Sequence, residues 1–190
     1  MPDRREELLD AAIVLVREGG YPALTQPRVA SLAGMTQGHL TYYFPTRADL
    51  VSAVAARIVR TQLATFDAQP VPASMDQAVA NVSALIAARE TTRALAALLL
   101  AADVEPGARE AFVELAAGMR QRATGLVAVL SGDALDPEST DAHRVRGRLL
   151  HAASVGAAVL SLAEGGHTDD EANAELVGYL LEVLASSAPR

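Results

Sequence analysis

The stretch TQPRVASLAGMTQGHLTYYFPTRADL, residues 25–50, decides the fold. Thr25 suits the N-cap of a short helix, because its hydroxyl can accept a hydrogen bond from a free backbone N–H. Pro27 then lies in the first turn of that helix, where a missing N–H costs least. Gly34 ends the helix and can adopt the left-handed conformation of a tight turn. Thr36 caps the next helix, so the stretch predicts a helix-turn-helix.

The second helix of this motif is predicted over residues 37–44, and Pro45 ends it. Val29, Met35 and Leu40 are expected to point inward and hold the crossing of the two helices. The remaining surface of the second helix presents hydrogen-bonding or slim side chains and no carboxylate: Gln37, Gly38, His39, Thr41, Tyr42 and Tyr43. Such a face suits base edges and phosphates in the major groove of DNA.

Several of these residues also have a simpler interpretation. Tyr43 and Phe44 can belong to the hydrophobic core, and His39 can be a solvated helix residue. Arg28, on the preceding helix, can form a surface salt bridge instead of reaching DNA. The four histidines lack the spacing of chelating residues, so the sequence predicts no metal site.

Five short motifs follow one another along the N-terminal quarter of the chain: Arg5-x-x-Leu8-Leu9-x-Ala11-Ala12, Gly19-Gly20-Tyr21, Leu24-Thr25, Val29-Ala30-x-x-Ala33-Gly34-Met35-Thr36-x-Gly38-x-Leu40 and Tyr43-Phe44-x-x-Arg47-x-x-Leu50. In this order and spacing they resemble the DNA-binding head of TetR-family transcriptional regulators. The rest of the chain matches that family only in the number and length of its predicted helices. Two positions depart from the family pattern, which usually has Tyr in place of Thr41 and Lys in place of Arg47.

The resemblance implies a role in DNA binding for each residue on the exposed face. The residues expected to contact the phosphate backbone are Thr25, Tyr42, Tyr43 and Arg47. The residues expected nearest the base edges are Gln37, Gly38 and His39, with Arg28 reaching in from the preceding helix and Thr41 on the same face. Phosphate contacts position a protein on DNA and base contacts specify the sequence. We therefore expect sequence-specific binding to double-stranded DNA.

The whole chain is predicted to be all-α, because apolar residues recur at helical spacing and strand patterns are nearly absent. Besides the helix-turn-helix, we expect one helix before Gly19-Gly20, a fourth over about 46–68, and five more at about 74–89, 91–103, 107–131, 138–164 and 169–187. Residues 1–48 are the predicted DNA-binding head of three helices. Residues 49–190 are the predicted helical body for ligand binding and dimerisation, which gives about nine helices in all.

The last two predicted helices are apolar on more than one face, so each must be buried on several sides. An interface of four helices, two from each of two subunits, satisfies this requirement. Its expected residues are Ala152, Ala153, Gly156, Ala157, Leu160, Leu176, Tyr179, Leu180, Val183 and Leu184. A homodimer would place two reading helices one DNA turn apart, as a palindromic operator requires. The alternative is the ordinary core of a monomer.

The resemblance also implies a small-molecule pocket in the body. The candidate lining residues are Phe66, Met75, Phe112, Leu115, Met119, Leu126, His151 and Ser154. Several of them recur at helical spacing and can equally be core. Buried hydroxyl and imidazole groups need hydrogen-bond partners, which a ligand can supply. Because charges are few here, we expect an apolar or weakly polar effector that releases a repressor from DNA, with the fourth helix as the lever.

Composition narrows the remaining function classes. The net charge is −7, yet residues 1–60 hold seven arginines and six acids, so the acidity lies in the body. The chain has no cysteine, which excludes disulfides and thiolate metal sites. It also lacks a P-loop and a G-x-S-x-G motif, so we expect no cofactor and no enzyme. The other alternative is a helical protein-interaction module without DNA binding.

The sequence also indicates where in the cell the protein is located. The N-terminal residues contain no apolar stretch behind a basic cluster, and no uncharged apolar stretch approaches the roughly 20 residues of a membrane span. We therefore expect a cytoplasmic protein that does not enter a membrane.

Overall fold

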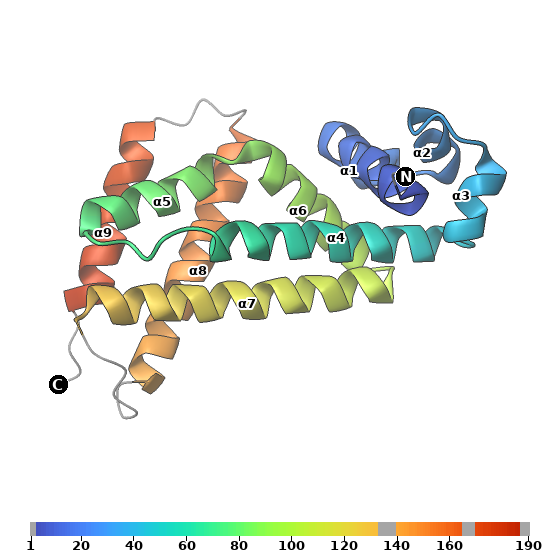
Figure 1. Ribbon diagram of the computed structural model, residues 1–190. Helices are drawn as coiled ribbons and strands as arrows, with labels where there is room; N and C mark the ends of the chain where they lie inside the picture. Colours follow the sequence, from blue (N-terminus) through green and yellow to red (C-terminus); the bar gives the residue numbers. More distant parts are fainter. Residues whose placement is uncertain (1–2, 133–139, 165–169, 187–190) are drawn as a thin grey trace. The chain divides into compact units, whose positions relative to one another are not determined.

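The computed structural model describes residues 3–132, 140–164 and 170–186, and these contain nine α-helices and no β-strand (Figure 1). The helices are α1 (Arg4–Ala23), α2 (Gln26–Leu32), α3 (Gln37–Tyr43), α4 (Arg47–Asp67), α5 (Met75–Ala87), α6 (Arg89–Ala102), α7 (Pro106–Leu130), α8 (Thr140–Ala163) and α9 (Asp170–Ser186). The predicted all-α class with an N-terminal helix-turn-helix is confirmed. Where the structure describes them, the predicted helix boundaries differ from the observed ones by a few residues, as expected where helix ends fray. The predicted starts at residues 138 and 169 and the predicted end at residue 187 lie outside the described residues.

The chain forms two compact units, each made of two separate segments. The first unit consists of residues 1–67 and 93–115, and the second of residues 68–92 and 116–190. The predicted boundary at residue 48 falls within α4, inside the first unit. The compact units therefore do not coincide with the predicted head and body. The division into a DNA-binding head and a ligand-binding body remains a prediction.

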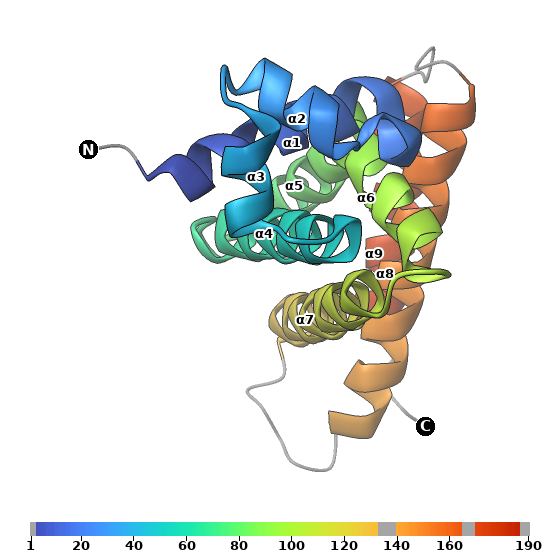
Figure 2. The ribbon, with the colours of Figure 1, turned by 90° about the vertical axis from the view of Figure 1, so that its right-hand side faces the viewer.

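The core of the first unit is built from apolar residues at helical spacing. Leu8 and Leu9 of α1, Leu40 of α3 and Leu50 of α4 have no exposed surface. Figure 2 shows α1, α2 and α3 gathered beside the N-terminal half of α4. Truncating one such leucine to alanine typically destabilises a protein by about 2–5 kcal/mol. The core therefore fixes the orientation of α3, which carries the candidate DNA-reading face.

Two glycines make the turns that shape this unit. Gly34 has φ +63°, and the N–H of the next residue, Met35, donates to the carbonyl of Ala30 at 2.8 Å. This closes the turn between α2 and α3. Gly20 has φ +68° and ψ −169°, so the regular part of α1 ends there, as predicted, although one further turn continues to Ala23. A left-handed backbone conformation is accessible to glycine at little cost.

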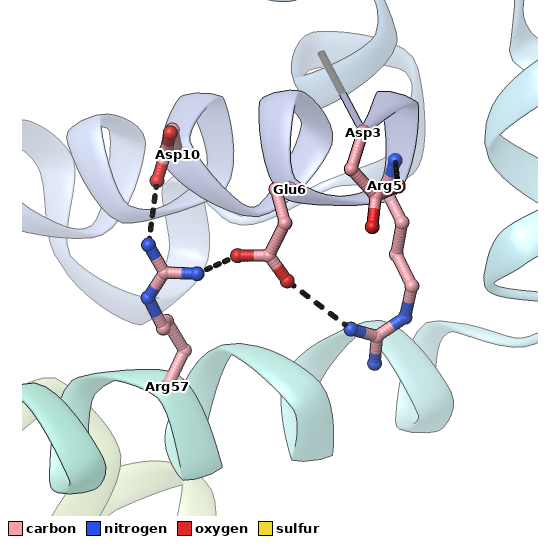
Figure 3. A network of polar contacts seen from close by, with 5 residues as sticks. All are labelled: Asp3, Arg5, Glu6, Asp10 and Arg57. Atoms are coloured by element: carbon pink, nitrogen blue, oxygen red, sulfur yellow. Dashed lines mark hydrogen bonds and ion pairs between the residues drawn. The ribbon is translucent and has the colours of Figure 1, made fainter. Parts of the chain in front are cut away.

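A polar network connects α1 to α4 on the surface of the first unit (Figure 3). Arg57 of α4 forms ion pairs with Glu6 and with Asp10 of α1, the latter at 3.4 Å. Glu6 also pairs with Arg5 at 3.5 Å. Asp3 caps α1 by accepting a hydrogen bond from the backbone N–H of Arg5 at 3.0 Å. Exposed ion pairs contribute little individually, about 0–1 kcal/mol, and here the two pairs of Arg57 join α4 to α1.

In the second unit α5 packs against both α8 and α9. Its buried core consists of Ala78, Val82, Ile86, Val127, Leu150, Val177, Leu181 and Leu184. None of the helices in the described parts of the chain is long and apolar enough to span a membrane.

Candidate nucleic-acid interface

The first turn of α3 exposes the three residues predicted to lie nearest base edges. Thr36 is the N-cap, and its side chain accepts a hydrogen bond from the backbone N–H of His39 at 3.3 Å. Gln37, Gly38 and His39 are all exposed. Because the cap fixes the backbone of this turn, these side chains project from a rigid element rather than from a loop. His39 is solvated, which is compatible with both of its interpretations.

The second turn of α3 carries the residues expected at phosphates. Tyr42 is 79% exposed, and its ring meets the half-buried Tyr43 edge-on with centroids 5.1 Å apart. The Thr41 hydroxyl donates to the carbonyls of Gln37 and Gly38, both at 3.1 Å. Its proton is therefore used within the helix, and only its lone pairs face outward. The neighbouring Phe44 is 2% exposed and belongs to the core.

Two residues of the preceding helix remain available to DNA. Arg28 is exposed and forms no ion pair or hydrogen bond with the residues that the structure describes, so its alternative role in a surface salt bridge gains no support. Thr25 is the N-cap of α2, but its side chain makes no capping hydrogen bond. Sequence reasoning missed Gln26, whose side-chain Nε2 donates to the carbonyl of Phe44 at 2.9 Å. This bond joins the start of α2 to the end of α3.

Arg47, at the start of α4, is already engaged by the protein. Its guanidinium lies over the ring of Tyr21, 4.5 Å from the centroid. One nitrogen of this guanidinium, Nη1, donates both to the Tyr21 hydroxyl at 2.5 Å and to Glu105 Oε1 at 3.1 Å. No sequence signal indicated Glu105, because it lies 58 residues away along the chain.

The charge of this surface is suited to an anion. Neither α2 nor α3 contains an acidic residue, and Arg28 adds a positive charge. Asp49, in the first turn of α4, accepts hydrogen bonds from Thr46, whose backbone N–H and hydroxyl donate to Oδ2 at 2.9 and 2.8 Å. The exposed faces of α2 and α3 therefore carry no carboxylate of their own that would repel a phosphate.

Comparison with known proteins identifies the family. Residues 8–54 match the family model described as "Bacterial regulatory proteins, tetR family". An HTH-type transcriptional regulator of Mycobacterium bovis is 30% identical over 145 residues, which cover 72% of this chain and 74% of that relative. The chain belongs to the TetR family. It is accordingly a transcriptional regulator with a DNA-binding helix-turn-helix, and the family assignment confirms the expectation that it is not an enzyme.

Solved structures of TetR-family and related regulators share the whole fold. A transcriptional regulator from Rhodococcus sp. Rha1 superposes with a TM-score of 0.79 at 23% identity, covering 95% of each chain. The multidrug binding protein EbrR, solved in complex with proflavin, superposes with a TM-score of 0.66 at 25% identity, covering 94% of this chain and 99% of EbrR.

The residues predicted for a TetR-family dimer interface all lie in the second unit. Leu160, Leu176, Tyr179 and Val183 are between 43% and 70% exposed. Ala152, Ala153 and Gly156 are exposed as well, on the same face of α8 as Leu160. Ala157 and Leu180 are half-buried and pack against the core of this unit. Leu184 differs from the prediction, because it is 5% exposed and forms part of that core.

The residues predicted for a TetR-family ligand pocket are divided between the two units. Phe66, Phe112 and Leu115 belong to the first unit, and Met75, Met119, Leu126, His151 and Ser154 to the second. Met75 and Leu126 pack against the core of the second unit. The Ser154 hydroxyl donates to the carbonyl of Leu150 at 2.9 Å, so it does not need a ligand as its partner. The pocket therefore remains a prediction.

His151 is the titratable group of this set. It is half-buried on α8, and desolvation, followed by the nearby positive charge of Arg120, lowers its pKa below the usual 6.5. The imidazole is therefore neutral at pH 7, with one nitrogen that can accept a hydrogen bond.

Proposed function

We propose that this TetR-family regulator is a homodimeric repressor that binds a palindromic operator and leaves it when a small apolar molecule binds. The observation that carries the proposal is the first turn of α3, where Gln37, Gly38 and His39 are exposed on a capped helix without any carboxylate. Such a turn fits the major groove, where the first residues of a recognition helix contact base edges.

The proposal of a dimer is supported by the exposed apolar surface of α8 and α9. Leu149, Gly156 and Leu160 lie on one face of α8, and Leu176, Tyr179 and Val183 on one face of α9. Large apolar side chains exposed along helix faces in this way indicate association between subunits. Two subunits would present two α3 helices to the two half-sites of a palindrome.

The proposal of an effector is supported by the similar EbrR structure, which holds proflavin. We propose that the effector of this chain is apolar or weakly polar, because the predicted lining residues are mostly apolar, and that α4 transmits its binding. A ligand can shift the equilibrium between two arrangements only by its difference in affinity for them. A DNA-binding regulator of this kind would act in the cytoplasm.

A gel-shift assay with the DNA upstream of its own coding region tests the proposed DNA binding. We expect a retarded band at nanomolar protein that unlabelled random DNA does not compete away. A thermal-shift screen of hydrophobic compounds tests the effector, and at least one compound should raise the melting temperature and reverse the gel shift. A compound that stabilises the protein without affecting the band contradicts the proposed release.

A protein-interaction module without DNA binding predicts the opposite gel-shift result. It would leave both operator and random duplexes unretarded at every protein concentration. The exposed Arg28 and the lack of acids on α2 and α3 favour DNA over that alternative.

A further inference from the structure

Three side chains of the first unit form a closed triangle, which we call the Arg47 clasp: Tyr21, Arg47 and Glu105. Arg47 Nη1 donates to the Tyr21 hydroxyl at 2.5 Å and to Glu105 Oε1 at 3.1 Å. The Tyr21 hydroxyl donates in turn to the same oxygen of Glu105 at 3.3 Å. The Tyr21 ring also faces the guanidinium, 4.5 Å away, which adds a cation–π contact.

The local backbone conformation positions two members of the clasp, Tyr21 and Glu105. The kink at Gly20 places Tyr21 in the extra turn at the end of α1. Glu105 lies at the corner between α6 and α7, where its N–H donates to the carbonyl of Ala101 at 2.8 Å. Arg109 fixes the same corner by donating from Nε to the carbonyl of Ala102 at 3.0 Å. The carboxylate is therefore presented to Arg47 by a rigid turn.

The two charges of the clasp differ in their access to water. The Glu105 side chain is 15% exposed, whereas that of Arg47 is 43% exposed. A carboxylate with so little hydration depends on the donors around it, which here are Arg47 and Tyr21. A DNA phosphate that takes Arg47 away leaves Glu105 poorly solvated. A phosphate that leaves the clasp closed meets a guanidinium whose charge is already neutralised.

We propose that Glu105 is an intramolecular competitor for the DNA phosphate that Arg47 contacts, and so lowers the DNA affinity of this regulator. The inference rests on the proposed function, which assigns Arg47 to the phosphate backbone. Glu105 touches no DNA itself and acts only through Arg47. Because phosphate contacts carry no sequence information, it lowers the affinity for all DNA alike.

The test replaces the carboxylate and keeps its shape, by Glu105→Gln. Glutamine can still accept from Arg47 and Tyr21, but it leaves the guanidinium charge free. We expect Glu105→Gln to bind a fluorescent random-sequence duplex and an operator duplex about two- to fivefold more tightly than the wild-type protein, the range of one partly exposed charge pair. Fluorescence anisotropy at fixed salt measures both affinities.

Two controls distinguish the release of Arg47 from the general effect of removing one negative charge. Asp103→Asn removes the same charge from the same corner, where Asp103 is exposed and its side chain has no contact with Arg47 that the structure describes. It should change affinity less than twofold. In the Arg47→Ala background, Glu105→Gln should no longer tighten binding. Glu105→Ala also removes the carboxylate and should tighten binding too, so it tests the proposal even if Glu105→Gln folds poorly. Tyr21→Phe leaves the ion pair between Arg47 and Glu105 in place and should change the affinity less than either variant.

Several results overturn the inference. Weaker binding by Glu105→Gln means that Glu105 positions Arg47 for DNA instead of competing for it. Competition between Glu105 and DNA for Arg47 is ruled out by any of three results: unchanged binding, an equal gain in affinity in Asp103→Asn, or a gain that persists in the Arg47→Ala background. If the wild-type protein binds no DNA at all, the proposed function fails; if it binds DNA and only the gain is missing, the inference fails alone.

Discussion

We propose that sequence recognition depends on Gln37 and His39. Both are exposed in the first turn of α3, and Thr36 holds that turn in place. We expect Gln37→Ala and His39→Ala to reduce discrimination between operator and mismatched duplexes by about 1–3 kcal/mol at the base pairs they read. Competition binding with single-mismatch duplexes measures this loss.

Gln121→Ala is the matched control for these two variants. Gln121 is an exposed glutamine of α7 with no side-chain hydrogen bond in the structure's described parts. It should leave both affinity and discrimination unchanged. If Gln37→Ala and His39→Ala behave like Gln121→Ala, another surface reads the bases.

His151 makes stability depend on pH at a single residue. Its pKa is lowered in the folded protein, chiefly by desolvation and then by Arg120, so the unfolded chain takes up a proton more readily. Stability is therefore intact above the ordinary pKa of 6.5 and falls as the pH drops below it. Carboxylates contribute to the same curve, but they are common to the wild-type protein and the His151→Gln variant. We expect the urea midpoint to fall less in His151→Gln between about pH 7.5 and about pH 5.5, and an identical fall contradicts the burial of this imidazole.

Among the structural elements, the turn between α2 and α3 gives a direct test of the predicted backbone conformation. Gly34 has φ +63°, and an added Cβ would meet nothing within 4 Å. Gly34→Ala therefore adds backbone strain without a clash, and we expect it to destabilise the protein by about 1–2 kcal/mol. Thermal or urea unfolding gives the value.

Gly125→Ala is the corresponding control. Gly125 lies within α7, has an ordinary helical backbone, and an added Cβ there also meets nothing within 4 Å. Alanine should stabilise this helix by about 0.5–1 kcal/mol. Opposite signs at the two glycines are expected, and destabilisation of equal size at both would show that backbone conformation is not the cause.

Features that depend on neighbours in the sequence could be predicted, and those that depend on packing could not. The cap at Thr36, the turn at Gly34 and the burial of Val29 and Leu40 all follow from local spacing, and the structure bears them out. The pairing of Arg47 with Glu105 joins residues 58 positions apart, and nothing in the local pattern indicates it.

The same limit applies to the last two helices. Spacing showed that α9 is apolar on more than one side, but it could not tell which side faces the core of its own subunit. Leu184 faces that core, whereas Tyr179, five residues earlier, is 70% exposed. Both residues are largely apolar, so their different exposure depends on which side of α9 packs against the core and not on hydrophobicity.

For the whole molecule, reading a palindromic operator requires a dimer. Leu160 of α8 is 62% exposed within a face of small and apolar residues. Leu160→Arg places a charge in the proposed interface, where burying it unpaired is costly. We expect sedimentation to show a dimer for the wild-type protein at micromolar concentration and a monomer for Leu160→Arg.

Val113→Arg provides a control of equal exposure. Val113 lies on α7 and is 61% exposed, but it is outside the proposed interface. This variant should remain dimeric and bind DNA like the wild-type protein. A monomeric wild-type protein, or dissociation by Val113→Arg as well, contradicts the interface on α8 and α9.

We propose that two copies of α3 read a symmetric DNA sequence, and selection of bound duplexes from random oligonucleotides is the experiment that tests this. We expect enrichment of an inverted repeat whose half-sites are centred about one helical turn, roughly 34–36 Å, apart or a multiple of that distance. We also expect Gln37→Ala and His39→Ala to select altered half-sites with the same spacing. Enrichment of no sequence, or of a single half-site without symmetry, would show that the two α3 helices do not read DNA in this way.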